Sequence, residues 1–251
     1  MSIAREHLKA RALSTFSAQG PRPCQEDQFL VDRERGIYVM ADGFGGLPAG
    51  IDAAKISCET IRSYLFKEAG DQEATFPFVL RTYFSLAGNV LFNSLIYANR
   101  KLRGMNQSKS VHERGGASVI AAFMDGDLLS LANVGVCTAW LMRAGSGVDL
   151  VIPRSYRHLT DPFHTDRVNE VLAPLMALGI CEDLEPEITE VRIQAGDWLV
   201  LATDGIPDQT RKQLIQLQDG TQTPDQAVQK IDVLLSKLTV RENASMVVIL
   251  F

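Results

Sequence analysis

Short apolar runs separated by tight polar turns recur along this chain, and they restrict its fold more than any other feature. Consecutive runs of this kind occupy residues 28–31 and 37–41, 117–124 and 128–134, 138–143 and 148–152, and 188–193 and 198–203. The connection Asp125-Gly126-Asp127 is a strong tight-turn signal, and strands joined by so few residues pair antiparallel. We therefore expect four β-hairpins, followed by a last strand over residues 245–251.

Helical periodicity marks the segments between these hairpins. After Pro48, apolar residues recur every three or four positions from Ile51 to Leu65, and residues 79–102 carry a longer repeat that ends near Gly104. Shorter helices are expected at residues 167–176, 211–217 and 225–237. Two antiparallel sheets with helix pairs outside them would bury every apolar face. The expected fold class is α+β, a four-layer αββα sandwich of two antiparallel sheets flanked by helix pairs.

Length, charge and cysteine content narrow the class of protein. The 251 residues contain no linker, repeat or low-complexity tract, so we expect one domain over residues 1–251. A net charge of −5 argues against a nucleic-acid surface, and no apolar run is long enough to span a membrane or to act as a secretory signal. The scattered cysteines fit no zinc or redox spacing. Reduced thiols in a cytoplasmic protein are therefore expected.

Four acidic residues differ from the rest because they stand where apolar strands begin or end. Asp42 and Asp204 each follow an apolar run and precede a glycine, whereas Glu26 and Glu242 stand just before such a run. One Asp-Gly pair after a buried strand is often only a turn. If the strand ends converge, however, repulsion among four carboxylates raises their pKa values or demands cations. Carboxylates without a His or Cys cluster favour magnesium or manganese over zinc.

Five blocks of sequence, in order, resemble the type 2C family of metal-dependent protein phosphatases. They are residues 20–27, residues 41–46 with Asp42-Gly43-Phe44-Gly45-Gly46, residues 114–118 with 131–135, residues 177–179 with 196–208, and Glu242-Asn243. The resemblance covers nearly the whole chain, and the family's fold is also an αββα sandwich. It implies hydrolysis of phosphoserine and phosphothreonine in proteins by a metal-bridging hydroxide, with no covalent phosphoenzyme.

The resemblance also implies a role for each matching residue. Asp42 would bridge two Mn²⁺ or Mg²⁺ ions. Glu26 and the carbonyl of Gly43 would hold one ion, and Asp204 and Glu242 would hold the other.

Further roles follow from the same resemblance. Arg22 would grip the phosphate, because a guanidinium fork matches phosphate oxygens. Glu113 and Asp208 match positions that hold a third metal in parts of the family. Residues 153–186 take the place of the family's flap beside the active site. The implied partner is a phosphorylated protein made by a Ser/Thr kinase, and the chain is expected to be a monomer in signal transduction.

Several positions depart from the family pattern. Glu242 and Glu113 replace the usual Asp, and Gly135-Val136-Cys137-Thr138 replaces Gly-Asp-Ser-Arg. Phe44 stands where some members carry a His that protonates the leaving oxygen. Cys24 is either a redox switch near the metals or an inert thiol. These departures leave an alternative open, a weakly active or inactive phosphatase-like domain that binds a phosphoprotein or a signalling partner.

Overall fold

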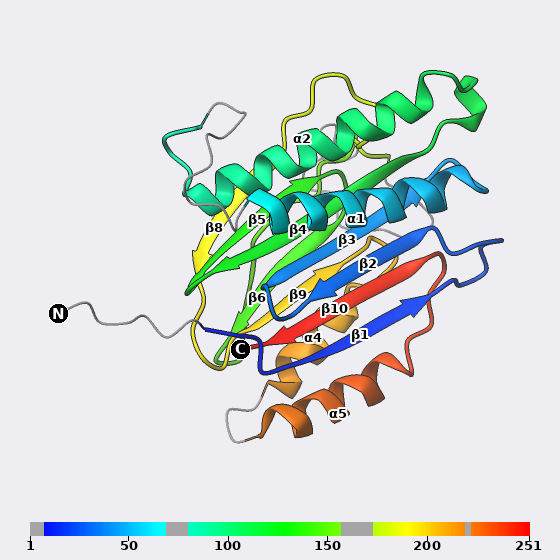
Figure 1. Ribbon diagram of the computed structural model, residues 1–251. Helices are drawn as coiled ribbons and strands as arrows, with labels where there is room; N and C mark the ends of the chain where they lie inside the picture. The colour runs from blue at the N-terminus through cyan, green and yellow to red at the C-terminus, as the bar shows by residue number, and fades with distance from the viewer. Residues whose placement is uncertain (1–7, 69–79, 157–172, 219–221) are drawn as a thin grey trace.

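Two antiparallel sheets form the centre of the protein (Figure 1). The computed structural model describes residues 8–68, 80–156, 173–218 and 222–251. The first sheet contains, in spatial order, β1 (Ala12–Ala18), β10 (Ala244–Leu250), β9 (Trp198–Ala202), β6 (Thr138–Arg143) and β7 (Ser146–Asp149). The second sheet contains β2 (Asp27–Asp32), β3 (Ile37–Phe44), β4 (Gly116–Asp125), β5 (Leu128–Val134) and β8 (Glu187–Arg192).

Helices cover the outer face of each sheet (Figure 1). The second sheet carries α1 (Ala49–Glu68) and α2 (Leu86–Asn106), and the first sheet carries α4 (Gln209–Leu217) and α5 (Pro224–Leu235). A short 3₁₀ helix, Val111–Glu113, precedes β4. Apolar clusters fill all three spaces between these four layers. The expected α+β fold, an αββα sandwich, is therefore confirmed.

The alternation of side chains along β3 decides where its acidic residue points. Ile37, Val39 and Ala41 belong to the apolar cluster under α1 and α2, whereas Tyr38 and Met40 belong to the cluster between the sheets. Successive side chains of a strand point to opposite faces. The side chain of the next residue, at position 42, therefore lies on the face between the sheets.

No described helix is long and apolar enough to cross a membrane.

Three of the four expected hairpins are confirmed, as β2–β3, β4–β5 and β6–β7, but the last one is wrong. β8 pairs with β5 at the edge of the second sheet, whereas β9 lies between β10 and β6 in the first sheet. Every residue of β9 is buried, as a central strand requires, and no residue of β8 is fully buried. The turn at residues 194–197 therefore carries the chain from one sheet to the other.

Other boundaries also differ from expectation. α2 begins at Leu86 rather than at residue 79, because the Ser85 side chain caps the helix and accepts a hydrogen bond from the Gly88 N–H at 3.0 Å. β1 was not expected, because serine and threonine interrupt its apolar residues, and it pairs with β10. β7 ends at Asp149 rather than at residue 152. Most of the helix expected at residues 167–176 lies outside the described residues, and residues 173–176 are not helical.

The turn that joins the two sheets generates a prediction about stability. Asp197 is 1% exposed and accepts hydrogen bonds from Arg143 Nε at 2.7 Å, Arg143 Nη2 at 2.6 Å and the Gln194 N–H at 2.8 Å. We expect Asp197→Ala to lower the free energy of unfolding by about 2–4 kcal/mol in urea, because the two charged hydrogen bonds from Arg143 and the bond from the Gln194 N–H are all lost. The matched control is Asp127→Ala, whose pair with Arg192 is exposed on both sides. It should cost no more than about 1 kcal/mol, and equal losses would contradict the assignment.

Candidate active site

Four strands, two from each sheet, have neighbouring ends at one end of the sandwich. Asp27 begins β2 directly opposite Asp42 of β3 in the second sheet. In the first sheet, Asp204 follows β9 and Glu242 precedes the neighbouring strand β10. The two sheets therefore each contribute two carboxylates to the same region.

Asp42 stands at the electrostatic centre of this group. Burial raises the pKa of its carboxyl well above the usual range, and the negative charges of Asp204, Asp27 and Glu242 raise it further. The structure thus brings together three of the four predicted carboxylates. It also adds Asp27, which the sequence pattern does not single out.

Asp27 is 5% exposed and is only partly satisfied by its surroundings. The Thr203 hydroxyl donates to its Oδ2 at 2.9 Å, whereas Oδ1 has no hydrogen-bond partner among the described residues. Burial raises the pKa of Asp27 to about 6, and the charge of Glu242 adds to this while the Thr203 hydroxyl opposes it. The sequence holds a signal for this residue, because the register of the first hairpin puts position 27 opposite position 42.

Glu26 lies beside this group and is fixed through both its side chain and its main chain. Its Oε1 accepts a hydrogen bond from the Gly46 N–H at 2.9 Å, and its carbonyl accepts one from the Gly43 N–H at 3.2 Å. Its carboxylate also fills the space where a side chain of Gly50 would lie. The glycines near Glu26 therefore allow the loop, β3 and α1 to approach closely.

Asn243 holds the loop that carries Glu26. Its Oδ1 accepts the Glu26 N–H at 2.9 Å, and its amide donates to the carbonyls of Gln19 at 2.9 Å and Cys24 at 2.8 Å. Cys24 is a buried free thiol. Asn243, next to the predicted ligand Glu242, thus ties the start of β10 to the start of β2.

Arg22 and Glu242 form an ion pair with each other, Nη2 to Oε2, at 3.1 Å. Their side chains are 48% and 31% exposed. An ion pair this exposed contributes about 0–1 kcal/mol to stability, so Arg22 or Glu242 can leave it for a partner that binds more strongly.

The two residues expected at a third metal differ from the main group. Glu113 is exposed, and its Oε2 accepts from the Ser110 N–H at 3.1 Å and the Ser110 hydroxyl at 2.8 Å. These bonds lower the pKa of Glu113. Asp208 is exposed at the start of α4, and its side chain does not cap that helix.

Of the residues that depart from the family pattern, Cys137 lies close to the carboxylates. Cys137 is fully buried, and its Sγ is 3.7 Å from the Ser118 carbonyl. Burial raises the pKa of this thiol well above its ordinary value, and the charge of Asp42 adds to the effect. Val136 is buried as well, and the Thr138 hydroxyl donates to the Ala202 carbonyl at 3.4 Å. Cys137 is therefore a neutral thiol here.

The carboxylates have the donor atoms and the charge that a hard cation needs, but their side chains are not grouped as a metal site. Within the described part of the chain, no three His, Cys, Asp or Glu side chains are grouped so that they could hold a metal ion as they stand. The donors are nevertheless all carboxylates, which Mg²⁺ and Mn²⁺ prefer, and a cation would relieve the repulsion at Asp42. The residue types therefore suit divalent cations, whereas the described side chains do not form a metal site as they stand.

The raised pKa of Asp27 generates a prediction about pH. Because its folded pKa of about 6 exceeds the ordinary 3.8, the folded state holds this proton more tightly than the unfolded state. The resulting stability is complete below the unfolded pKa and is lost as the pH rises through the folded pKa. In the presence of chelator, we expect the free energy of unfolding of the wild type to fall by up to about 3 kcal/mol between pH 4 and 7. The Asp27→Asn variant should not show this fall. Urea unfolding measures this difference, and parallel pH profiles would contradict it.

Comparison with known proteins gives one match by sequence. No family model matches the chain. A curated rice protein (Oryza sativa subsp. japonica), described as probable protein phosphatase 2C 55, is 26% identical over 264 residues. The alignment covers 94% of this chain, and the chain spans 64% of the length of that relative.

Solved structures match over nearly the whole chain. PppA, a regulatory component of the T6SS in Pseudomonas aeruginosa, has a TM-score of 0.75 at 21% identity, covering 97% of this chain and 98% of that one. The Mycobacterium tuberculosis serine/threonine phosphatase PstP has a TM-score of 0.74 at 19% identity, covering 96% and 98%. At these sequence identities, the similarity to solved structures is evidence for the fold alone. The chain is therefore similar in sequence to a protein phosphatase of type 2C and similar in fold to serine/threonine phosphatases.

Proposed function

We propose that this chain is a metal-dependent phosphatase that removes phosphate from phosphoserine and phosphothreonine in proteins. The observation that carries the proposal is the burial of Asp42 beside Asp27, Asp204 and Glu242. Buried like charges cost free energy and add nothing to an ordinary binding surface, whereas they suit divalent cations. The similarity to serine/threonine phosphatases supports the same activity.

The carboxylates would divide between two Mn²⁺ or Mg²⁺ ions. Asp42 would bridge them, with Glu26 and the Gly43 carbonyl on one ion and Asp204 and Glu242 on the other. One solved neighbour, the catalytic domain of PstP, is a complex with two manganese ions. Bound ions of this kind lower the pKa of a shared water so that it can attack phosphorus.

A third ion has less support from the residues around it. The Glu113 carboxylate already accepts two hydrogen bonds from Ser110. Such an ion would have to compete with these bonds, and Asp208 would have to supply the rest of the site.

Arg22 would bind the phosphate of the substrate. Its guanidinium is half exposed, and among the described residues its ion-pair partner is Glu242. A phosphate dianion offers a bidentate partner, and a metal ion would draw the Glu242 carboxylate away. Arg22 would then be free to orient the phosphate beside Asp42.

The proton for the leaving oxygen must come from a group other than Phe44, which cannot donate one. Cys137 is buried behind the carboxylates and has no path to the substrate. A metal-bound water or another acid at the site would have to supply the proton. The substrate is a phosphorylated protein, so the enzyme would oppose a serine/threonine kinase.

A second function is favoured by one observation, the ion pair between Arg22 and Glu242. In this ion pair, Arg22, which would bind the phosphate, and Glu242, which would bind a metal ion, are both already engaged. In the second function the chain is a weakly active or inactive phosphatase-like domain that acts by binding a phosphoprotein or a signalling partner.

One assay separates the two functions. We expect hydrolysis of a phosphothreonine peptide in manganese, none in excess chelator, and a loss of at least about 10³-fold in Asp42→Asn, because an amide cannot replace a bridging carboxylate. The Asp42→Asn protein should stay folded, since the substitution removes repulsion. Equal turnover in the variant would refute the proposed site. Peptide binding without turnover in any divalent metal would favour the second function.

Gly50 provides a test of Glu26 that does not depend on activity. A methyl group at Gly50 would overlap the Glu26 carboxylate, which must then move and lose its bond to the Gly46 N–H. We expect Gly50→Ala to weaken manganese binding about tenfold in calorimetry, because one anionic ligand is displaced.

The matched control is Gly104→Ala in α2, where nothing lies within 4 Å of the added methyl group. It should bind manganese like the wild type and be about 0.5–1 kcal/mol more stable, because alanine favours a helix. Wild-type manganese affinity in both variants would remove Glu26 from the metal site.

A further inference from the structure

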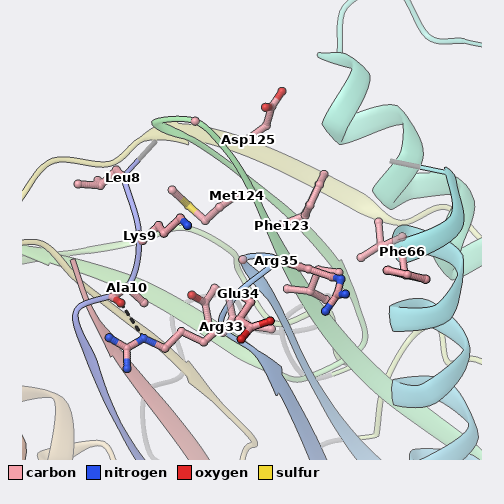
Figure 2. Close-up of a pocket in the computed structure, with 15 residues that line it drawn as sticks. Leu8, Lys9, Ala10, Arg33, Glu34, Arg35, Phe66, Phe123, Met124 and Asp125 are labelled. Carbon is pink, nitrogen blue, oxygen red and sulfur yellow. Dashed lines mark hydrogen bonds between the residues drawn. The ribbon is translucent and has the colours of Figure 1, made fainter. Parts of the chain in front are cut away.

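A pocket of 370 Å³ lies at the end of the sheets opposite the candidate active site (Figure 2). β3 runs from Ile37, which lines the pocket, to Asp42, and five residues of strand span about 17 Å. The pocket is formed by residues 8–10, the turn at 33–36, the end of α1 and the turn at 123–126. It is therefore a separate feature from the carboxylate group.

Hydrogen bonds hold these distant segments in place. Arg33 Nε donates to the Ala10 carbonyl at 2.8 Å, and Arg33 also donates to the Arg11 carbonyl. The Met124 N–H donates to the Gly36 carbonyl at 3.0 Å. Gly36 has a φ of +64°, and a Cβ on it would be 2.7 Å from the Met124 Cβ. The pocket is thus preformed by the fold, as ligand sites usually are.

One wall of the pocket is aromatic. Phe66 at the end of α1 is 53% exposed, and the Arg35 guanidinium lies 4.6 Å from its ring centroid. Phe123 and Met124 of β4 line the pocket as well. Aromatic rings and guanidinium planes pack well against a flat ring, and methionine adapts to its shape. The wall therefore suits a planar aromatic group.

The polar groups favour a negative charge on that ligand. Lys9 is exposed and makes no hydrogen bond or ion pair with the described residues, and Figure 2 shows its ammonium directed toward Met124. In the same view, the Asp125 carboxylate points away from the Lys9 ammonium. Among the described residues, the Arg33 side chain donates to two carbonyls and forms no ion pair. Of the two acidic lining residues, Glu34 and Asp125, Glu34 is therefore the one that opposes these cations.

Arg35 adds to this positive charge. Arg35 and Arg62 share the carboxylate of Asp32, so among the described residues two guanidinium charges pair with one carboxylate charge. The two guanidinium groups hold the pKa of Asp32 below its ordinary value despite its burial. The chain as a whole has a net charge of −5, but the surface at this pocket has an excess of positive charge, which attracts anions.

We propose that this pocket binds a small aromatic carboxylate, with its ring against Phe66 and Phe123 and its carboxylate facing Lys9. The site is independent of the proposed phosphatase activity, so binding is measured without any assay of turnover.

Calorimetry on the full chain with three naphthalene probes tests the proposal. They carry the same ring with different charges: 1-naphthoate, 1-naphthalenemethanol and 1-naphthylmethylammonium. We expect saturable binding at one site, strongest for the carboxylate and weakest for the ammonium. No saturable binding of 1-naphthoate, or equal affinity for all three probes, would overturn the proposal.

Four variants locate the site. Lys9→Gln should weaken 1-naphthoate binding about fivefold and Glu34→Gln should strengthen it by a similar factor, because each changes one charge near the carboxylate. Phe66→Ala should weaken the binding of all three probes about tenfold. The control Lys212→Gln, on the exposed face of α4, should change nothing. Lys9 is exposed, so its variant should fold normally, and wild-type affinity in both Lys9→Gln and Glu34→Gln would refute the assignment.

Discussion

Repulsion among carboxylates at one end of the two sheets is the constraint on which the arrangement of this protein depends. Asp42 is buried beside three other acidic side chains, and this arrangement opposes folding wherever the acids are charged. The apolar layer behind it supplies the opposing free energy. Tyr38 and Met40 precede Asp42 on the same face of β3, and they pack between the sheets with residues such as Leu201. The acidic group therefore sits at the edge of a dry core that extends along the rest of the strand.

The backbone around the site is shaped to let segments approach closely. Gly43 and Gly50 stand where a side chain would strike the main chain or the carboxylate of Glu26. Asn243 then fixes the same loop through three hydrogen bonds to main-chain groups. Precise placement of a ligand needs such support, because a carboxylate on a loose loop loses entropy when it binds. The geometry at Glu26 thus depends on residues that have no charge of their own.

The sequence predicted the layers and the main acidic residues, because both leave local patterns. Apolar runs and tight turns identified three hairpins. Asp42 lies near the end of β3 and Asp204 follows β9, and both come directly after apolar runs that are visible in the sequence. Pairing between distant segments left no such pattern. β8 and β9 are joined by a short turn like a hairpin, yet they belong to different sheets, because β9 must be buried on both faces. Asp27 was missed for a related reason, since its importance comes from its partner across the hairpin rather than from its own neighbours.

The balance of charge at the site also bears on the order in which ligands bind, if the proposed function holds. A phosphate dianion approaching the metal-free site would meet several carboxylates and one guanidinium, and that guanidinium is already paired with Glu242. Protonation of Asp42 removes only one of these negative charges. Attraction of phosphate therefore requires cations first, which would reverse the sign of the local field and release Arg22 from Glu242. The ion pair and the acidic group are then two parts of one arrangement, in which metal binding prepares the site for its substrate.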